Sequence, residues 1–243
     1  MRAFRGRFRP SRGPALAFAA AAGVHLGALA GGAAPVARAT KPVLMPLLAE
    51  YVLRRGGPRT LALALLCGCA GDTLLQLSGE LPFLLGMGAF AAGHGCYLAL
   101  FARHGDRPTS RRLAAGYAAA WAGTTALLWP GLPAGLRPPV ALYGLLLTAT
   151  AYGAVRTRRR AAAGGALFLL SDTLIAAGLA GRPQPPVPQF WIMLTYLGAQ
   201  YLLAEGVLKA AADDAEGARQ RPGPPHASAA RHFFTAARAS TMP

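Results

Sequence analysis

Two aspartates stand inside long apolar segments of this chain, each in nearly the same short phrase. Asp72 lies in Gly-Asp-Thr-Leu-Leu (71–75), and Asp172 lies in Ser-Asp-Thr-Leu-Ile (171–175). A charged side chain at the centre of a bilayer costs from about 3 to more than 10 kcal/mol, depending on how the cost is measured. Apolar surroundings favour the neutral form of a carboxyl group, which suits general acid chemistry. The two phrases therefore predict a shared site, with hydrogen bonds that merely join helices as the structural alternative.

Other polar side chains fall at a similar depth in neighbouring apolar segments. A helix rises about 1.5 Å per residue, so His94, Gln200 and His25 can lie in the same layer as the two aspartates. Tyr97 is one turn from His94 on the same helix face. Small residues flank His25 and favour a hydrogen bond between helices over a ligand role.

The composition predicts an integral membrane protein of the all-α class. The 243 residues are 53% hydrophobic and 14% charged, with a mean hydropathy of +0.34. Apolar runs of membrane length predict a polytopic bundle of eight transmembrane helices, at roughly 14–34, 41–53, 60–78, 82–102, 111–129, 138–155, 161–180 and 190–208. We expect a basic cytoplasmic tail over residues 1–13, a transmembrane domain over 14–209 and a disordered cytoplasmic tail over 210–243.

The basic residues predict the orientation of these spans. A net charge of +16 would suggest nucleic acid in a soluble protein, but here the basic residues sit between apolar segments. With eight spans, 21 of the 25 Lys and Arg residues fall on one side of the membrane and 4 on the other. The positive-inside rule then predicts a multi-pass protein of the cell membrane with both termini in the cytoplasm and no nucleic-acid partner. The arginine-rich start, an apolar stretch and Ala37-Arg38-Ala39 also fit a cleaved signal peptide.

The two aspartate phrases belong to a longer internal similarity. Lys41-Pro42 opens the apolar run before Asp72, and Arg137-Pro138 opens the run before Asp172. This order suggests a parallel four-plus-four repeat. Cys67, Cys69 and Cys96 show no metal-ligand spacing, and we interpret all three as packing residues.

Five motifs in order resemble the lysoplasmalogenase family, also called YhhN-like, of eight-helix membrane proteins. They are KPVLMP (41–46), GDTLL (71–75), GMGAFAAGHGCY (86–97), ALFLLSDTLIA (166–176) and YLGAQ (196–200). The resemblance implies hydrolysis of the vinyl ether bond of lysoplasmalogens to a fatty aldehyde and a glycerophospho-alcohol. The partners would be a lysophospholipid or ether-lipid substrate and the lipid bilayer, with no cofactor and no metal.

The residues suit that reaction, because a vinyl ether is hydrolysed by protonation of its β-carbon and capture of an oxocarbenium ion by water. Asp72 and Asp172 would be the catalytic acid/base pair, as paired carboxylates are in glycosidases. His94, Gln200 and Tyr97 would orient the water or polarise the ether oxygen. Lys41, at the outer end of its span, would hold a phosphate or anchor the helix at the interface.

Two other readings of the same residues stay open at this point. The aspartates with His25 and His94 could bind zinc in a zinc-dependent lipid hydrolase, although no His-x3-His signature is present. Alternatively, buried carboxyl groups could carry protons or a solute in a small-solute or proton-coupled transporter built from two repeats.

Overall fold

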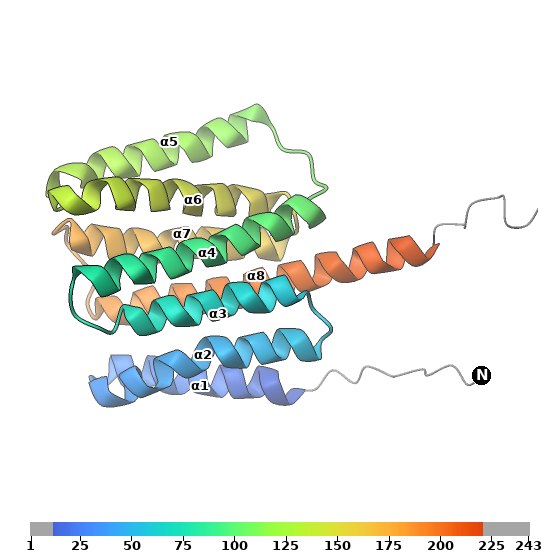
Figure 1. Cartoon of the computed structure of the whole chain (residues 1–243), viewed down its shortest axis with the longest axis horizontal. Coiled ribbons are helices and arrows are strands. Elements are labelled where there is room, and N and C mark those ends of the chain that lie inside the picture. The colour runs from blue at the N-terminus through green and yellow to red at the C-terminus, as the bar shows by residue number, and fades with distance from the viewer. Residues whose placement is uncertain (1–11, 221–243) are drawn as a thin grey trace, which may run out of the picture. The chain divides into compact units, whose positions relative to one another are not determined.

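The computed structural model describes residues 12–220, and this part of the chain is all helical with no strand. Eight α-helices and two short 3-10 helices follow one another: α1 (Arg12–Ala30), α2 (Ala34–Arg54), α3 (Arg59–Leu74), α4 (Glu80–His104), α5 (Arg111–Leu128), η1 (Trp129–Gly131), η2 (Ala134–Leu136), α6 (Arg137–Val155), α7 (Arg159–Leu179) and α8 (Pro188–Gln220). Successive helices run in opposite directions, so the starts of α3, α5 and α7 lie at the same end as the last turns of α2, α4 and α6 (Figure 1).

The all-α class is confirmed, and eight α-helices lie close to the eight apolar runs. Within residues 12–220, four helical segments are both long and apolar enough to cross a membrane: Gly13–Ala30, Glu80–His104, Ala134–Val155 and Arg159–Leu179. These segments indicate a membrane protein. The remaining helices, α2, α3, α5 and α8, fall short of this combined criterion of length, hydropathy and charge.

The second helix differs from the prediction in a way that matters for the site. We expected it over 41–53, but α2 begins at Ala34, and Pro35 occupies its first turn, where proline is well tolerated. Pro42 and Pro46 therefore lie inside the helix. Pro46 has no N–H to donate to the carbonyl of Pro42, and the Cys69 thiol of α3 donates to that oxygen instead at 3.2 Å. Cys69 thus has a hydrogen-bonding role beyond the packing that we expected.

The last helix also extends beyond the predicted span. Residues 210–220, which we expected to lack regular structure, continue α8 to Gln220, and the alanines among them favour a helix. The chain divides into two compact units after Ala211, and the described part of the second unit is this final stretch of α8. The basic tail predicted at 1–13 and the rest of the C-terminal tail lie almost wholly outside the described residues.

The core of the first unit holds α7 directly against α8. A Cβ at Gly164 would lie 2.8 Å from the carbonyl oxygen of Ala199 and 2.8 Å from the amide nitrogen of Leu203. Only glycine allows the two backbones to approach so closely, as small residues do between membrane helices. This contact fixes α7, and with it Asp172, against the helix that carries Gln200.

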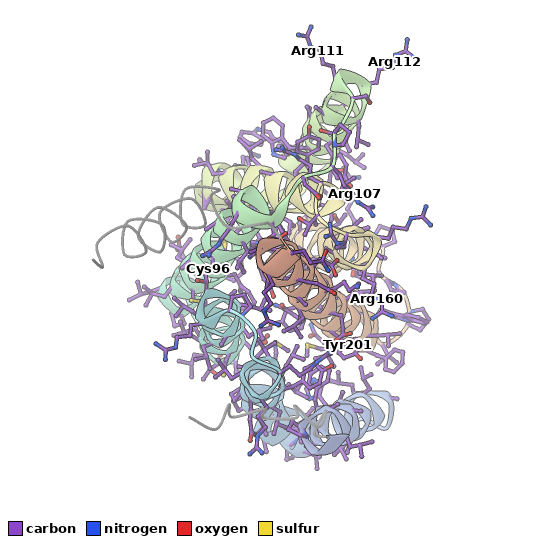
Figure 2. All side chains as sticks on the ribbon, turned by 90° about the vertical axis from the view of Figure 1, so that its right-hand side faces the viewer. Cys96, Arg107, Arg111, Arg112, Arg160 and Tyr201 are labelled. Carbon is purple, nitrogen blue, oxygen red and sulfur yellow. The ribbon has the colours of Figure 1, made fainter. Side chains whose placement is uncertain are left out.

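One end of the bundle is rich in arginine. Viewed from that end, Arg107, Arg111, Arg112 and Arg160 extend around the helix ends (Figure 2). Among them, the buried carboxylate of Glu205 accepts hydrogen bonds from Tyr51 (2.7 Å), Arg55 (2.6 Å) and Arg160 (3.0 Å). These hydrogen bonds join α2, α7 and α8 at this end of the bundle.

Candidate active site

Asp72 and Asp172 line one cavity of about 260 Å³. They sit on α3 and α7, at the same number of residues from the first residue of each helix, Arg59 and Arg159. Both helices start at the arginine-rich end (Figure 1), which brings the carboxyl groups to a similar height. The cavity also takes side chains from the neighbouring helices, among them Lys41, Phe90, Tyr143, Ser171 and Tyr196.

Asp72 forms an ion pair in this cavity. Its Oδ1 lies 3.3 Å from the Nζ of Lys41, and the Asp72 residue is only 3% exposed. Lys41 does not lie at the start of its helix as we expected, because α2 begins at Ala34 and Lys41 comes nearly two turns later. The Lys41 ammonium offers a positive charge to the Asp72 carboxylate, and the roles at a phosphate or at the membrane interface stay predictions.

Asp172 has a different partner. The hydroxyl of Tyr143 on α6 donates a 2.6 Å hydrogen bond to its Oδ2, and no Lys or Arg pairs with it among the described residues. The same hydroxyl lies 3.3 Å from Nε2 of His94, which is buried. Tyr143 thus joins Asp172 to His94, a link that places the predicted supporting histidine beside the site.

The other two predicted supporting residues contact each other. The Tyr97 hydroxyl of α4 donates to Oε1 of Gln200 on α8 at 2.5 Å, and both side chains are buried. Tyr196 stands one turn before Gln200, and its hydroxyl makes no hydrogen bond of regular geometry. The same is true of Oδ2 of Asp72, which interacts electrostatically with Tyr196. These two buried oxygens are available to a polar group that enters the cavity.

Sequence reasoning missed two residues of the site, Tyr143 and Tyr196. Tyr196 opens the YLGAQ motif, so its place in that motif was a usable signal. Tyr143 lies in an apolar run without any motif, and the sequence therefore predicts only a packing role for it. Only the packing of α6 against α7 reveals that its hydroxyl meets a carboxyl group.

The zinc reading finds no ligand set in the part of the chain that the structure describes. No three His, Cys, Asp or Glu side chains within residues 12–220 come together as metal ligands. His25, which that reading requires, bonds through Nδ1 to the Thr40 hydroxyl at 2.8 Å. It therefore contacts the neighbouring helix α2, as its small flanking residues suggested.

A helical membrane protein with two carboxyl groups in one cavity is the class that this geometry defines. The chain belongs to the YhhN family, whose model matches residues 36–207. It is 32% identical to the lysoplasmalogenase TMEM86B of Homo sapiens over 146 residues, 60% of this chain and 62% of that protein. It is also 32% identical to the lysoplasmalogenase TMEM86B of Sus scrofa over 68% of this chain and 72% of that protein. The lysoplasmalogenase of Mycobacterium bovis is 32% identical over 61% of this chain and 60% of that protein.

The matched region thus spans about three fifths of the human and mycobacterial relatives' lengths. No solved structure matches this chain. The family match includes both aspartates and every other residue that we placed at the site, since all lie within residues 36–207.

Proposed function

We propose that this protein is a membrane-embedded lysoplasmalogenase, which hydrolyses the vinyl ether bond of lysoplasmalogens to a fatty aldehyde and a glycerophospho-alcohol. The observation that carries the proposal is the pair of carboxyl groups that share a cavity but differ in their partners, an ammonium for the buried Asp72 and a phenol for the half-buried Asp172. The lysoplasmalogenases to which the chain is similar support the same reaction class.

The different partners assign the two roles. The ammonium of Lys41 stabilises the ionised form of Asp72, so Asp72 serves as the base. Asp172 has no cationic partner among the described residues, and its apolar surroundings favour the neutral carboxylic acid, so it serves as the acid. Two carboxyl groups whose surroundings differ in this way are the usual arrangement for acid/base catalysis.

The reaction then closes as a proton cycle. Asp172 gives its proton to the β-carbon of the vinyl ether, and the double bond becomes an oxocarbenium ion. Water attacks the cationic carbon, and Asp72 takes a proton from that water molecule. The product of this step is a hemiacetal. Asp72 returns that proton to the ether oxygen as the C–O bond breaks, and Asp172 removes the hydroxyl proton. Aldehyde and glycerophospho-alcohol leave, and both aspartates regain their starting states.

The surrounding side chains position the reacting groups. Tyr143, held by His94, fixes the Asp172 carboxyl so that its other oxygen can carry the acidic proton. The Tyr196 hydroxyl provides a polar group beside Asp72 that can orient the attacking water. Gln200, which accepts the hydrogen bond from Tyr97, interacts with Tyr196 and positions it from outside this cavity. No cofactor or metal takes part in this cycle.

The membrane arrangement that we propose is the one predicted from the sequence. Eight helices span the cell membrane, with the arginine-rich end and both tails, 1–13 and 210–243, in the cytoplasm. Two observations support the four-plus-four repeat: each aspartate lies at the same position in its helix, and each is bound by a side chain of the preceding helix. The substrate, a lysophospholipid with an ether-linked chain, reaches the cavity from the bilayer.

The test is to identify the products of the purified protein by mass spectrometry. The full chain in detergent is incubated with a lysoplasmalogen and, separately, with the corresponding acyl lysophospholipid. We expect aldehyde from the first and no fatty acid from the second. Asp72→Asn and Asp172→Asn should each reduce aldehyde release by about a hundredfold or more, as expected for loss of an acid or base.

The matched control is Asp106→Asn, because Asp106 is an exposed carboxylate outside the cavity. This variant should keep the wild-type rate. Full aldehyde release by both cavity variants would refute the acid/base pair, and fatty acid from the acyl lipid would refute the reaction class.

A further inference from the structure

A second cavity adjoins the first on the far side of the Tyr143–Asp172 pair. Its volume is about 120 Å³, and it lies between α5, α6 and α7. Both Tyr143 and Asp172 line the two cavities, as do Val140 and Ala176. A molecule that touches Asp172 in the first cavity therefore has a short path into the second.

The second cavity presents an apolar lining. Leu128, Leu132, Leu147 and Leu169 contribute side chains to its wall. Thr124 and Thr125 of α5 also line the wall. Three other polar side chains bond to their own or the adjacent helix: Trp121 donates through Nε1 to the Ala141 carbonyl at 3.0 Å, Thr148 to the Gly144 carbonyl at 2.7 Å and Thr173 to the Leu169 carbonyl at 2.7 Å. Their methyl groups and ring carbons are then left to face an occupant, and an apolar cavity of this kind suits hydrocarbon better than water.

We infer that this second cavity is the subsite for the hydrocarbon chain of the substrate. The inference rests on the proposed function and adds to it the direction in which the substrate lies. With the vinyl ether carbons at Asp172, the next carbons of the alkenyl chain pass Tyr143 and enter between α5, α6 and α7. The polar glycerophospho-alcohol remains on the side of Lys41 and Asp72, where the cavity carries its charged groups.

The size of the subsite fits the first part of a chain. A water molecule takes about 30 Å³ of liquid volume, and a methylene group is of similar size, so the cavity holds roughly four carbons. Longer chains then continue outward past α5, the outermost helix on this side (Figure 1). We expect a higher kcat/KM for substrates whose chains fill this subsite than for substrates whose chains end before it.

Gly144 of α6 lines the second cavity, and a larger side chain at this position would reduce the volume of that cavity. A Cβ at this position would lie 3.6 Å from two atoms of the Trp121 ring, which is ordinary van der Waals contact. Alanine is therefore tolerated, and a leucine side chain would extend into the cavity that Trp121 lines. A Cβ at Gly144 meets neither carboxyl group within 4 Å, so its substitution changes the space for the chain and leaves the reacting groups in place.

The experiment compares aldehyde release from two lysoplasmalogens, one with a hexadecenyl chain and one with a prop-1-enyl chain that ends before the subsite. Gly144→Leu should reduce kcat/KM for the long chain about tenfold or more, which is the size of effect that a filled hydrophobic pocket produces. The prop-1-enyl substrate should keep its rate within about twofold. Gly144→Ala, which the structure accommodates, should give a smaller shift in the same direction.

The matched control is Leu142→Phe on the same helix, because Leu142 is 69% exposed on the outer surface. It should change neither substrate's kcat/KM. An equal loss for both substrates in Gly144→Leu, or no change in their ratio for either Gly144 variant, would overturn the subsite. Wild-type protein that releases no aldehyde from either lipid would overturn the proposed function itself.

A labelling experiment tests the subsite without turnover. A saturated ether lysophospholipid with a diazirine a few carbons from the ether oxygen is photolysed with the full-length wild-type protein. Adducts on residues 120–128 or 169–176 would support the subsite. Adducts confined to α3 and α4 would overturn it, whatever the outcome of the activity assay.

Discussion

Replacing Lys41 by methionine removes the cation that pairs with Asp72 in the cavity. Methionine keeps much of the apolar stem of lysine and loses the ammonium, so the change isolates the charge. The Nζ of Lys41 lies 3.3 Å from Oδ1 of Asp72, and the Asp72 side chain is 5% exposed. The variant therefore leaves a buried carboxylate without a counter-charge.

The size of the effect follows from this geometry. At 3.3 Å, two unit charges interact with about 5 kcal/mol at an effective dielectric constant of about 20. Measured losses on removing one partner of a buried ion pair are about 3 to 5 kcal/mol. Protonating an ordinary aspartate at pH 7 costs about 4 kcal/mol, which sets an upper limit, because the carboxyl group takes up a proton beyond it. We expect Lys41→Met to lower the free energy of unfolding by about 3 to 4 kcal/mol.

A double-mutant cycle measures this coupling. Lys41→Met, Asp72→Asn and the double variant are unfolded reversibly in mixed micelles, and the three changes in unfolding free energy are compared. Asp72→Asn in the Lys41→Met background should recover about 2 kcal/mol or more, because it removes the unpaired charge. Lys41→Arg, which keeps the charge, should retain most of the wild-type stability.

Additive effects of the two single changes would refute the ion pair as a source of stability. The same variants also test the assignment of the base. If Asp72 acts as a carboxylate, folded Lys41→Met should release aldehyde much more slowly than wild type, because a protonated Asp72 cannot accept a proton from water. A Lys41→Met variant with an unchanged rate would contradict that assignment.

Two further predictions concern the scaffold. Glu205→Gln removes the anion that Arg55 and Arg160 share, and we expect it to lower the unfolding free energy by about 1 to 2 kcal/mol. This loss is smaller than for a fully buried pair because both arginines are partly exposed. An unchanged melting temperature would contradict this role. Gly164→Ala places a Cβ against the backbone of α8 and should cost about 1 to 3 kcal/mol, whereas Gly123→Ala, which meets nothing within 4 Å, should be neutral or slightly stabilising. Equal melting temperatures for these two alanine variants would refute the close helix approach at Gly164.

The sequence predicted the helices well because apolar periodicity is a local property. Eight helices, the parallel direction of α3 and α7, and the similar height of Asp72 and Asp172 all follow from run lengths and loop positions. The supporting residues His94 and Gln200 were predicted from their depth, and Tyr97 from its place one turn from His94 on the same helix face. The structure places His94 next to the partner of Asp172 and pairs Tyr97 with Gln200.

Side-chain partners across helices could not be predicted in the same way. The place of Lys41 depends on where α2 begins, and a start at Ala34 moves this residue from the helix end into the cavity. Tyr143 has no neighbouring polar residue in its run to mark it, so its bond to Asp172 depends on the rotation of α6 against α7. Helix rotation is set by packing of the whole bundle, which a single sequence does not specify residue by residue.

The two partners of the aspartates give the proposed repeat a chemical meaning. In each half the aspartate is bound by the helix before it, Asp72 by Lys41 of α2 and Asp172 by Tyr143 of α6. Two carboxyl groups in identical surroundings would favour the same charge state, and neither would be specialised as acid or base. An ammonium in one half and a phenol in the other break that symmetry. If the proposed repeat arose by duplication, replacement of the partner in one half is therefore the change by which the two aspartates would acquire different roles in one cavity.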